Sequence, residues 1–133
     1  MNTKLLMASS SLVMGVLGIS FSFLPQELLS YVEVSSNGIA PLFLQVAGAL
    51  YIAFAMINWM TRTAVIGGIY NRPIAMCNFL HFSIGALALV KGLRAVPISA
   101  VLLVASIVYS LFAILFAIVL FRHPIKDDNA KRS

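Results

Sequence analysis

The polar residues of two long apolar segments are the best candidates for a functional site in this 133-residue chain. Within residues 74–90, only Asn78 and His81 are strongly polar, and their spacing of three places both on one face of a helix. An imidazole titrates near pH 6.5, so it can bind a polar group or carry a proton. An ionisable side chain is costly in lipid, and we therefore expect His81 to face protein or a water-filled cavity.

The preceding apolar segment and the loop after it supply the other candidate ligand-binding residues: Tyr51, Asn58, Trp59, Arg62 and Arg72. Tyr51 and Asn58 are seven positions apart and share a helix face, which Arg62 continues one turn later. Trp59 lies near the end of the apolar run, where tryptophan is typical of a membrane interface. These positions extend the candidate site from the middle of the 39–60 segment to Arg62 and Arg72 at its polar end.

The two polar faces are expected to meet if their helices are antiparallel neighbours joined by a short loop. Asn58 would then lie near Asn78, with His81 deeper and opposite Ala55 or Tyr51. Three interpretations of His81 stay open. It is a structural residue that hydrogen-bonds between helices, a functional residue that binds a ligand or moves a proton, or, least favoured, a metal or haem ligand that lacks a second donor nearby.

The composition excludes a soluble fold. Hydrophobic residues make up 61% of the chain and charged residues 10%, whereas soluble domains have about 45–50% and about 25%. The net charge of +5 comes from basic residues scattered singly between apolar segments, which is typical of membrane-flanking anchors and not of a nucleic-acid site. The single cysteine, Cys77, excludes an intrachain disulfide and paired-thiol redox chemistry.

Four segments are long and apolar enough to span a membrane, at about 20 residues each: 5–24, 39–60, 74–90 and 98–121. The first is too long for a signal peptide, and no small-x-small cleavage motif follows it. Pro41, Pro73 and Pro97 lie at or near the expected helix starts. The sequence predicts an all-α fold, a single membrane domain over 1–133 that forms an antiparallel four-helix bundle, with a tail over 122–133.

The positions of lysine and arginine predict the orientation. Seven basic residues fall on one side of the expected spans and two, Lys91 and Arg94, on the other; the seven are Lys4, Arg62, Arg72, Arg122, Lys126, Lys131 and Arg132. Positive residues concentrate on the cytoplasmic side, so both termini are expected in the cytoplasm and the chain in the inner membrane of a bacterium. The 25–38 loop is either a short helix at the interface, beginning at Pro25, or a half-ordered loop.

Small residues at helical spacing predict the packing faces, since they allow close approach of helices in lipid. The faces are Ser11, Gly15, Gly18 and Ser22; Gly48, Ala49, Ala53 and Ala55; Gly85 and Ala88; and Ser106, Ser110, Ala113 and Ala117. A face left over after bundle formation would bind a second copy, so a homo-oligomer or another membrane partner stays open.

The sequence carries no recognisable catalytic set and predicts no cofactor and no metal. All four carboxylates (Glu27, Glu33, Asp127 and Asp128) lie outside the expected spans, which excludes paired catalytic acids and a serine triad inside them. Gly67-Gly68 is only a weak turn signal, not a phosphate-binding loop. Small four-helix drug exporters depend on a glutamate in the first helix, and residues 5–24 contain none.

Two stretches carry a family resemblance: GVLGISFSFLPQELLSYV with VAGALYIAFAMINW, and YNRPIAMCNFLHFSIGALALVKG. The first helix that ends at a proline and the second with Gly-Ala-x-Tyr resemble the small four-helix bacterial membrane proteins of the DoxX-like group. The Asn-x-x-His-Phe stretch more weakly resembles the ergosterol-biosynthesis scaffold family, which has a histidine in a corresponding helix. The resemblance covers about residues 12–92 and implies a four-helix membrane fold without an established activity.

Three functions are compatible with these features. The leading hypothesis is a non-enzymatic membrane protein that binds a lipid-like small molecule or a membrane partner through the polar cluster around His81. The second is an enzyme or enzyme subunit acting on a lipid or quinone-like substrate, with His81 as acid and base and Arg62 or Arg72 on an anionic head group. The third is a transporter or channel subunit.

Overall fold

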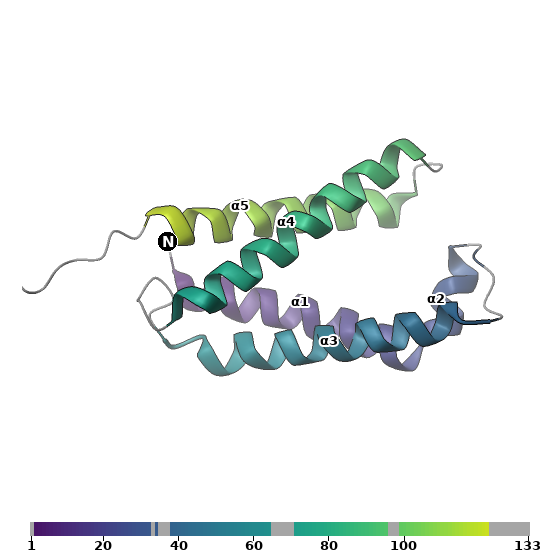
Figure 1. Ribbon diagram of the computed structural model, residues 1–133, viewed down its shortest axis with the longest axis horizontal. Helices are drawn as coiled ribbons and strands as arrows, with labels where there is room; N and C mark the ends of the chain where they lie inside the picture. The colour runs from purple at the N-terminus through teal and green to yellow at the C-terminus, as the bar shows by residue number, and fades with distance from the viewer. Residues whose placement is uncertain (1, 33, 35–37, 65–70, 96–98, 123–133) are drawn as a thin grey trace, which may run out of the picture. The chain divides into compact units, whose positions relative to one another are not determined.

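The computed structural model describes residues 2–32, 34, 38–64, 71–95 and 99–122. This part of the chain is helical, as expected. Its helices are α1 (Thr3–Phe23), α2 (Pro25–Tyr31), α3 (Ala40–Thr61), α4 (Arg72–Ala95) and α5 (Ala100–Arg122) (Figure 1). Residues 35–37 of the 25–38 loop, Pro97 and the tail beyond Arg122 lie outside the described residues.

Four helices, α1, α3, α4 and α5, are long and apolar enough to cross a membrane. They correspond to the four predicted spans, with ends that differ by a few residues. The largest difference is at the end of α4, which continues past the predicted end at residue 90 to Ala95. Lys91 and Arg94 therefore belong to the helix, and their long side chains can reach from its last turns toward a polar phase.

Local sequence explains where these helices begin. The Asn2 side chain accepts a hydrogen bond from the Leu5 N–H, and the Ser99 hydroxyl accepts one from the Leu102 N–H. Each side chain satisfies an N–H that the first turn leaves without a helical acceptor. Gly38, just before α3, has a φ of 98°, a conformation that L side chains rarely adopt.

The short helix α2 decides between the two alternatives for the 25–38 loop. Pro25 occupies its first turn, where the missing N–H costs no hydrogen bond, and Glu27 lies near the positive end of the helix dipole. The chain leaves α1 and enters α2 within two residues, with Leu24 between them. The prediction of a short helix at this position is confirmed, and Tyr31 and Val32 at its end are exposed.

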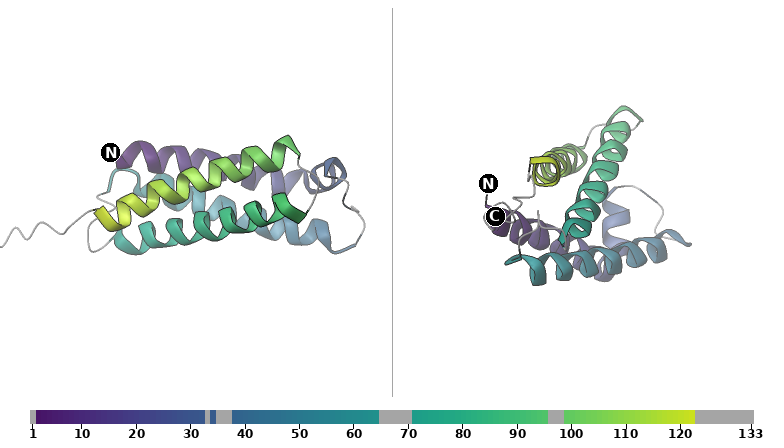
Figure 2. Two further views of the ribbon diagram at one scale, coloured as in Figure 1. Left: turned by 90° about the horizontal axis from the view of Figure 1, so that it is seen from above. Right: turned by 60° about the vertical axis from the view of Figure 1, so that its left-hand side comes forward.

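The chain divides into two compact units, Met1–Thr63 and Ala64–Ser133, and each is described by itself. In the first, α1 and α3 lie side by side with α2 at one end, which we call the first hairpin (Figures 1 and 2). In the second, α4 packs on α5, which we call the second hairpin. Both pairs are antiparallel, because residues early in one helix contact residues late in the other.

Small residues bring α1 and α3 into close contact, as the sequence predicted. A Cβ atom added to Gly48 would lie 2.7 Å from the Ser22 nitrogen and 2.8 Å from the Gly18 oxygen. Such distances leave no room for a side chain. Only glycine at position 48 lets the two backbones come this close at the crossing. The α1 face of Ser11, Gly15, Gly18 and Ser22 is turned toward α3. On α3, Gly48 and Ala55 are buried, whereas Ala49 and Ala53 are exposed.

Aromatic side chains fill most of the contact between α4 and α5. Phe82 is fully buried, and its ring stacks on those of Phe112 and Phe116 with centroids 4.8 and 5.7 Å apart. Nearer the start of α4, Phe79 meets Phe121 edge to face at 5.9 Å. The predicted small residues contribute less here: Gly85 and Ser106 lie in the contact, but Ala88 is exposed.

Candidate functional site

Asn58 is fully buried in the first hairpin and bonds to α1. Its Nδ2 atom donates to the Ser10 hydroxyl oxygen at 3.1 Å and lies 3.7 Å from the Met14 sulfur. The Ser10 hydroxyl in turn donates to the Met7 carbonyl oxygen at 3.0 Å. Asn58 thus links the two long apolar helices of its own unit, and the bond satisfies polar atoms that apolar neighbours could not.

A second hydrogen bond between α1 and α3 lies one turn away. The Ser11 hydroxyl donates to the Ala55 carbonyl oxygen at 2.7 Å. Sequence reasoning found Ser11 as a packing residue but missed Ser10 as the partner of Asn58. The signal was present in the serine run 9–11, three hydroxyls in the middle of an apolar helix.

Tyr51 also packs within the first hairpin. Its ring meets that of Phe21 edge to face, with centroids 5.4 Å apart and an interplanar angle of 74°. The side chain is half-buried. Tyr51 therefore contributes an aromatic contact to the α1–α3 pair, about two turns along α3 from Asn58.

Trp59 and Arg62 form a pair at the end of α3. The Arg62 guanidinium carbon lies 3.9 Å from the centroid of the Trp59 ring, and its Nη1 donates to the Trp59 main-chain carbonyl. Trp59 keeps 49% of its surface exposed. The cation is thus held against the ring face, an arrangement in which the negative face of the π system attracts it.

Asn78 is almost fully buried in the second hairpin, with 1% of its surface exposed. Its Nδ2 donates to the Ile74 carbonyl oxygen at 2.9 Å, one turn back on the same helix. Arg72, expected at the mouth of the site, is the first residue of α4 and is exposed. Asn78 and Arg72 thus lie at the start of α4, and His81 follows one turn after Asn78.

His81 packs against the ring of Tyr109 on α5, a neighbour that the sequence analysis did not identify. The ring centroids are 5.8 Å apart, and His81 also meets Phe82 edge to face at 5.1 Å. His81 is half-buried and Tyr109 is buried. Gly85 makes room for this arrangement, because a Cβ there would lie 2.6 Å from the Tyr109 ring carbons. The sequence signal for Tyr109 was its position as the single tyrosine of the apolar segment 98–121, which contains no charged residue.

The structure therefore divides the predicted site residues between the two units. Tyr51, Asn58, Trp59 and Arg62 belong to the first hairpin, and Arg72, Asn78 and His81 to the second. Ala55, expected opposite His81, lies against Gly15 and Ser11 of α1. The expected approach of Asn58 to Asn78 joins the two units and stays a prediction.

The chemistry of these groups is limited. Among the described residues, no three His, Cys, Asp or Glu side chains are placed to hold a metal ion. Cys77 is exposed on α4, and Glu27 on α2 is the only carboxylate residue in the described ranges. Apart from the basic residues near their ends and the Cys77 thiol, the long helices carry amides, hydroxyls, two separate phenols, one indole and one imidazole. These groups suit hydrogen bonding better than the acid–base chemistry of paired carboxylates.

Comparison with known proteins adds no relative to this picture. No family model, curated protein or solved structure matched the chain.

Proposed function

We propose that this chain is a multi-pass protein of a bacterial inner membrane, in which the two hairpins form one four-helix bundle with both termini in the cytoplasm. The exposed surface of the helices supports the membrane. Large apolar side chains are exposed along the whole of α1, among them Leu5, Leu12, Val16, Ile19 and Phe23. Exposing so continuous an apolar surface to water is energetically unfavourable, whereas contact with lipid tails, which are equally apolar, is not.

The basic residues support the orientation. Lys4 begins α1 and Arg62 follows α3, at the same end of the first hairpin. Arg72 begins α4, while Lys91 and Arg94 lie in its last turns. With Arg72 on the cytoplasmic side, Lys91 and Arg94 lie on the opposite side. The positive-inside rule requires only an excess of basic residues in the cytoplasm, so two on the other side are compatible with it.

We infer that the protein is not an enzyme and binds a lipid-like small molecule at His81. The observation that carries this proposal is the contact between His81 on α4 and Tyr109 on α5. Two rings with polar tips meet there inside otherwise apolar helices. Part of the His81 residue stays exposed, whereas its Nε2 atom is buried.

The chemistry of this position favours an amphiphile. Binding sites for small molecules are mostly apolar, with a few polar groups that fix orientation. Phe82 and Phe112 are buried beside the His81–Tyr109 pair and make its surroundings apolar. An imidazole hydrogen-bonds a hydroxyl, carbonyl or acidic head, and a chain or ring system would lie against the apolar helix surface.

Lipid extraction and mass spectrometry of the purified full chain test the proposal. The wild type should retain an amphiphile in stoichiometric amount, and His81→Leu should lose most of it while keeping its helical content. Cys77→Leu, an apolar change at an exposed position one turn away on α4, is the matched control and should retain the molecule. Equal retention by His81→Leu, or loss of a protein partner in place of a small molecule, would refute it.

A further inference from the structure

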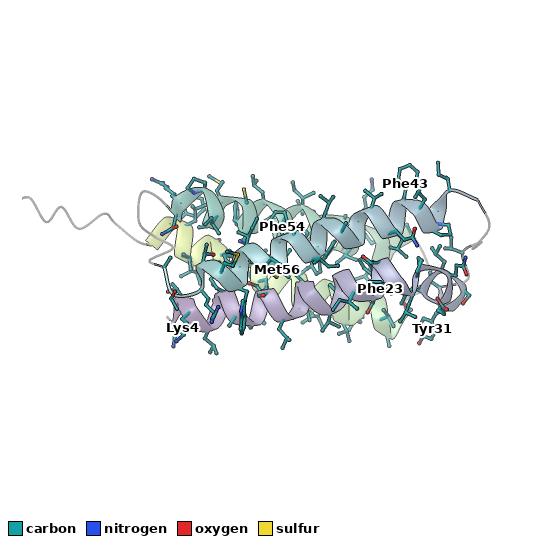
Figure 3. The ribbon with its side chains drawn as sticks, turned by 90° about the horizontal axis from the view of Figure 1, so that it is seen from below. Lys4, Phe23, Tyr31, Phe43, Phe54 and Met56 are labelled. Atoms are coloured by element: carbon teal, nitrogen blue, oxygen red, sulfur yellow. The ribbon has the colours of Figure 1, made fainter. Side chains whose placement is uncertain are left out.

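The end of the first hairpin where α1 begins and α3 ends, which we call the open end, brings two cations together. Ser11 bonds to Ala55 across the hairpin. Moving seven residues, or about two turns, from Ser11 toward the start of α1 reaches Lys4, and the same step from Ala55 along α3 reaches Arg62. The antiparallel register therefore sets Lys4 and Arg62 opposite each other. Figure 3 shows Lys4 at this end, with Tyr31 and Phe43 at the other.

No carboxylate of the described residues neutralises this pair. Glu27, the only carboxylate residue in those ranges, lies in the first turn of α2, at the opposite end of the hairpin. The start of α1 adds the positive end of a helix dipole beside Lys4. Two like charges at the same end of the hairpin repel each other, and both would be attracted to an anion bound between them.

Arg62 is held in a position to bind such an anion. Its guanidinium stacks on Trp59 and uses one donor on the Trp59 carbonyl. A guanidinium has five N–H donors in a planar fork that matches phosphate geometry, so several donors remain for a ligand. Stacking also reduces the conformational freedom that a free arginine would lose on binding.

Trp59 indicates the depth at which this site lies. Its ring is 49% exposed at the end of a span, where tryptophan sits at the level of lipid head groups. The anion available at that depth is the phosphodiester of a phospholipid. We propose that the open end binds the phosphodiester of an anionic phospholipid, with Arg62 and Lys4 as ligands and Trp59 as the residue that positions Arg62. This site lies on the first hairpin. It rests on the membrane location proposed above, but not on ligand binding at His81.

Native mass spectrometry of the full chain tests the proposal, with phosphatidylglycerol as the probe and phosphatidylcholine as the neutral comparison. Arg62→Gln should weaken retention of phosphatidylglycerol about tenfold, since hydrogen bonds to a charged group are involved. Lys4→Gln should weaken it about fivefold, the effect of one cation near a surface. Trp59→Leu keeps the net charge, and should weaken retention severalfold by releasing Arg62.

Arg94→Gln is the matched control, because it removes an exposed cation in the last turn of α4. It should leave phosphatidylglycerol retention within twofold of the wild type. If Arg62→Gln and Arg94→Gln reduce retention equally while Trp59→Leu has no effect, the lipid is attracted to basic residues in general. That result would refute the site. Displacement of the lipid by millimolar inorganic phosphate would also refute it, since free phosphate would then be the ligand. Circular dichroism checks that each variant is folded; should Arg62→Gln misfold, Trp59→Leu and Lys4→Gln carry the test.

Discussion

Asn58 on α3 donates a side-chain hydrogen bond to the Ser10 hydroxyl on α1, with 3.1 Å between Nδ2 and Oγ. Both residues have no exposed surface, so this bond between the two helices is fully buried. It is the clearest polar link within the first hairpin and gives Asn58 a structural role there, while the expected part of Asn58 in a ligand site stays a prediction.

A double-mutant cycle on Ser10→Ala and Asn58→Ala should give a coupling free energy of about 0.6 kcal/mol, and no more than about 1.7 kcal/mol, as for hydrogen bonds between membrane helices. Detergent-titration unfolding measures it. Ser9→Ala replaces Ser10→Ala in the control cycle, because the Ser9 hydroxyl donates to the Leu6 carbonyl of its own helix. A coupling as large in the Ser9 cycle would show that the bond does not carry the effect.

The crossing of α1 and α3 predicts different results for two glycine-to-alanine changes. Gly48→Ala should lower the free energy of unfolding by about 1–3 kcal/mol, because the new methyl group meets backbone atoms of Ser22 and Gly18. Gly15→Ala should be tolerated, since its Cβ would lie 3.7 Å from that of Ala55, an ordinary contact. Unfolding of both variants in the same detergent is the measurement. Equal stability of the two would contradict the described crossing.

The position of Tyr109 depends on Gly85. Gly85→Ala places a methyl group 2.6 Å from the Tyr109 ring carbons, so the ring must move, and with it the contact to His81. The expected loss is about 1–3 kcal/mol of unfolding free energy. In a Tyr109→Leu background the same change should cost less, because the clashing ring is gone. Strictly additive losses would mean that Gly85 and Tyr109 do not contact.

The proposed orientation predicts which helix ends a membrane-impermeant thiol reagent can reach. In a Cys77→Ala background, a cysteine at Ala95, at the end of α4, should be labelled in intact cells. One at Thr63, just after α3, should be labelled only after the cells are opened. The opposite pattern would place both termini outside, and labelling of both positions in intact cells would refute a single orientation.

The sequence predicted the four long helices well, because each is an apolar run of the length that crosses a membrane as a helix. The packing face of α1 was also predictable, since Ser11, Gly15, Gly18 and Ser22 are the small residues that permit close approach. Helical periodicity gives the face of a residue but not the helix that meets it. Ser10 and Tyr109 were missed for that reason. Ala55 contacts α1, and the expected position of Ala55 or Tyr51 opposite His81 stays a prediction.

The candidate site was predictable only as a set of residue types. A polar residue in an apolar helix signals a hydrogen bond, and both buried amides do make one: Asn58 donates to the Ser10 hydroxyl and Asn78 to the Ile74 carbonyl. Composition could not distinguish an amide that bonds its neighbour helix, as Asn58 does, from one that bonds its own backbone, as Asn78 does. His81 keeps its place as the leading candidate because its ring meets a second polar-tipped ring.

The most direct test of ligand binding at His81 is nitrogen-15 NMR of the imidazole. The chain has two histidines, so His123→Gln leaves His81 as the single labelled ring. Protein stripped of amphiphiles would be placed in lipid nanodiscs and titrated with the fraction extracted from the purified wild type. Binding at this site predicts a saturable change in the His81 nitrogen shifts that an equal amount of bulk phospholipid does not cause. Unchanged shifts at saturating extract would contradict it.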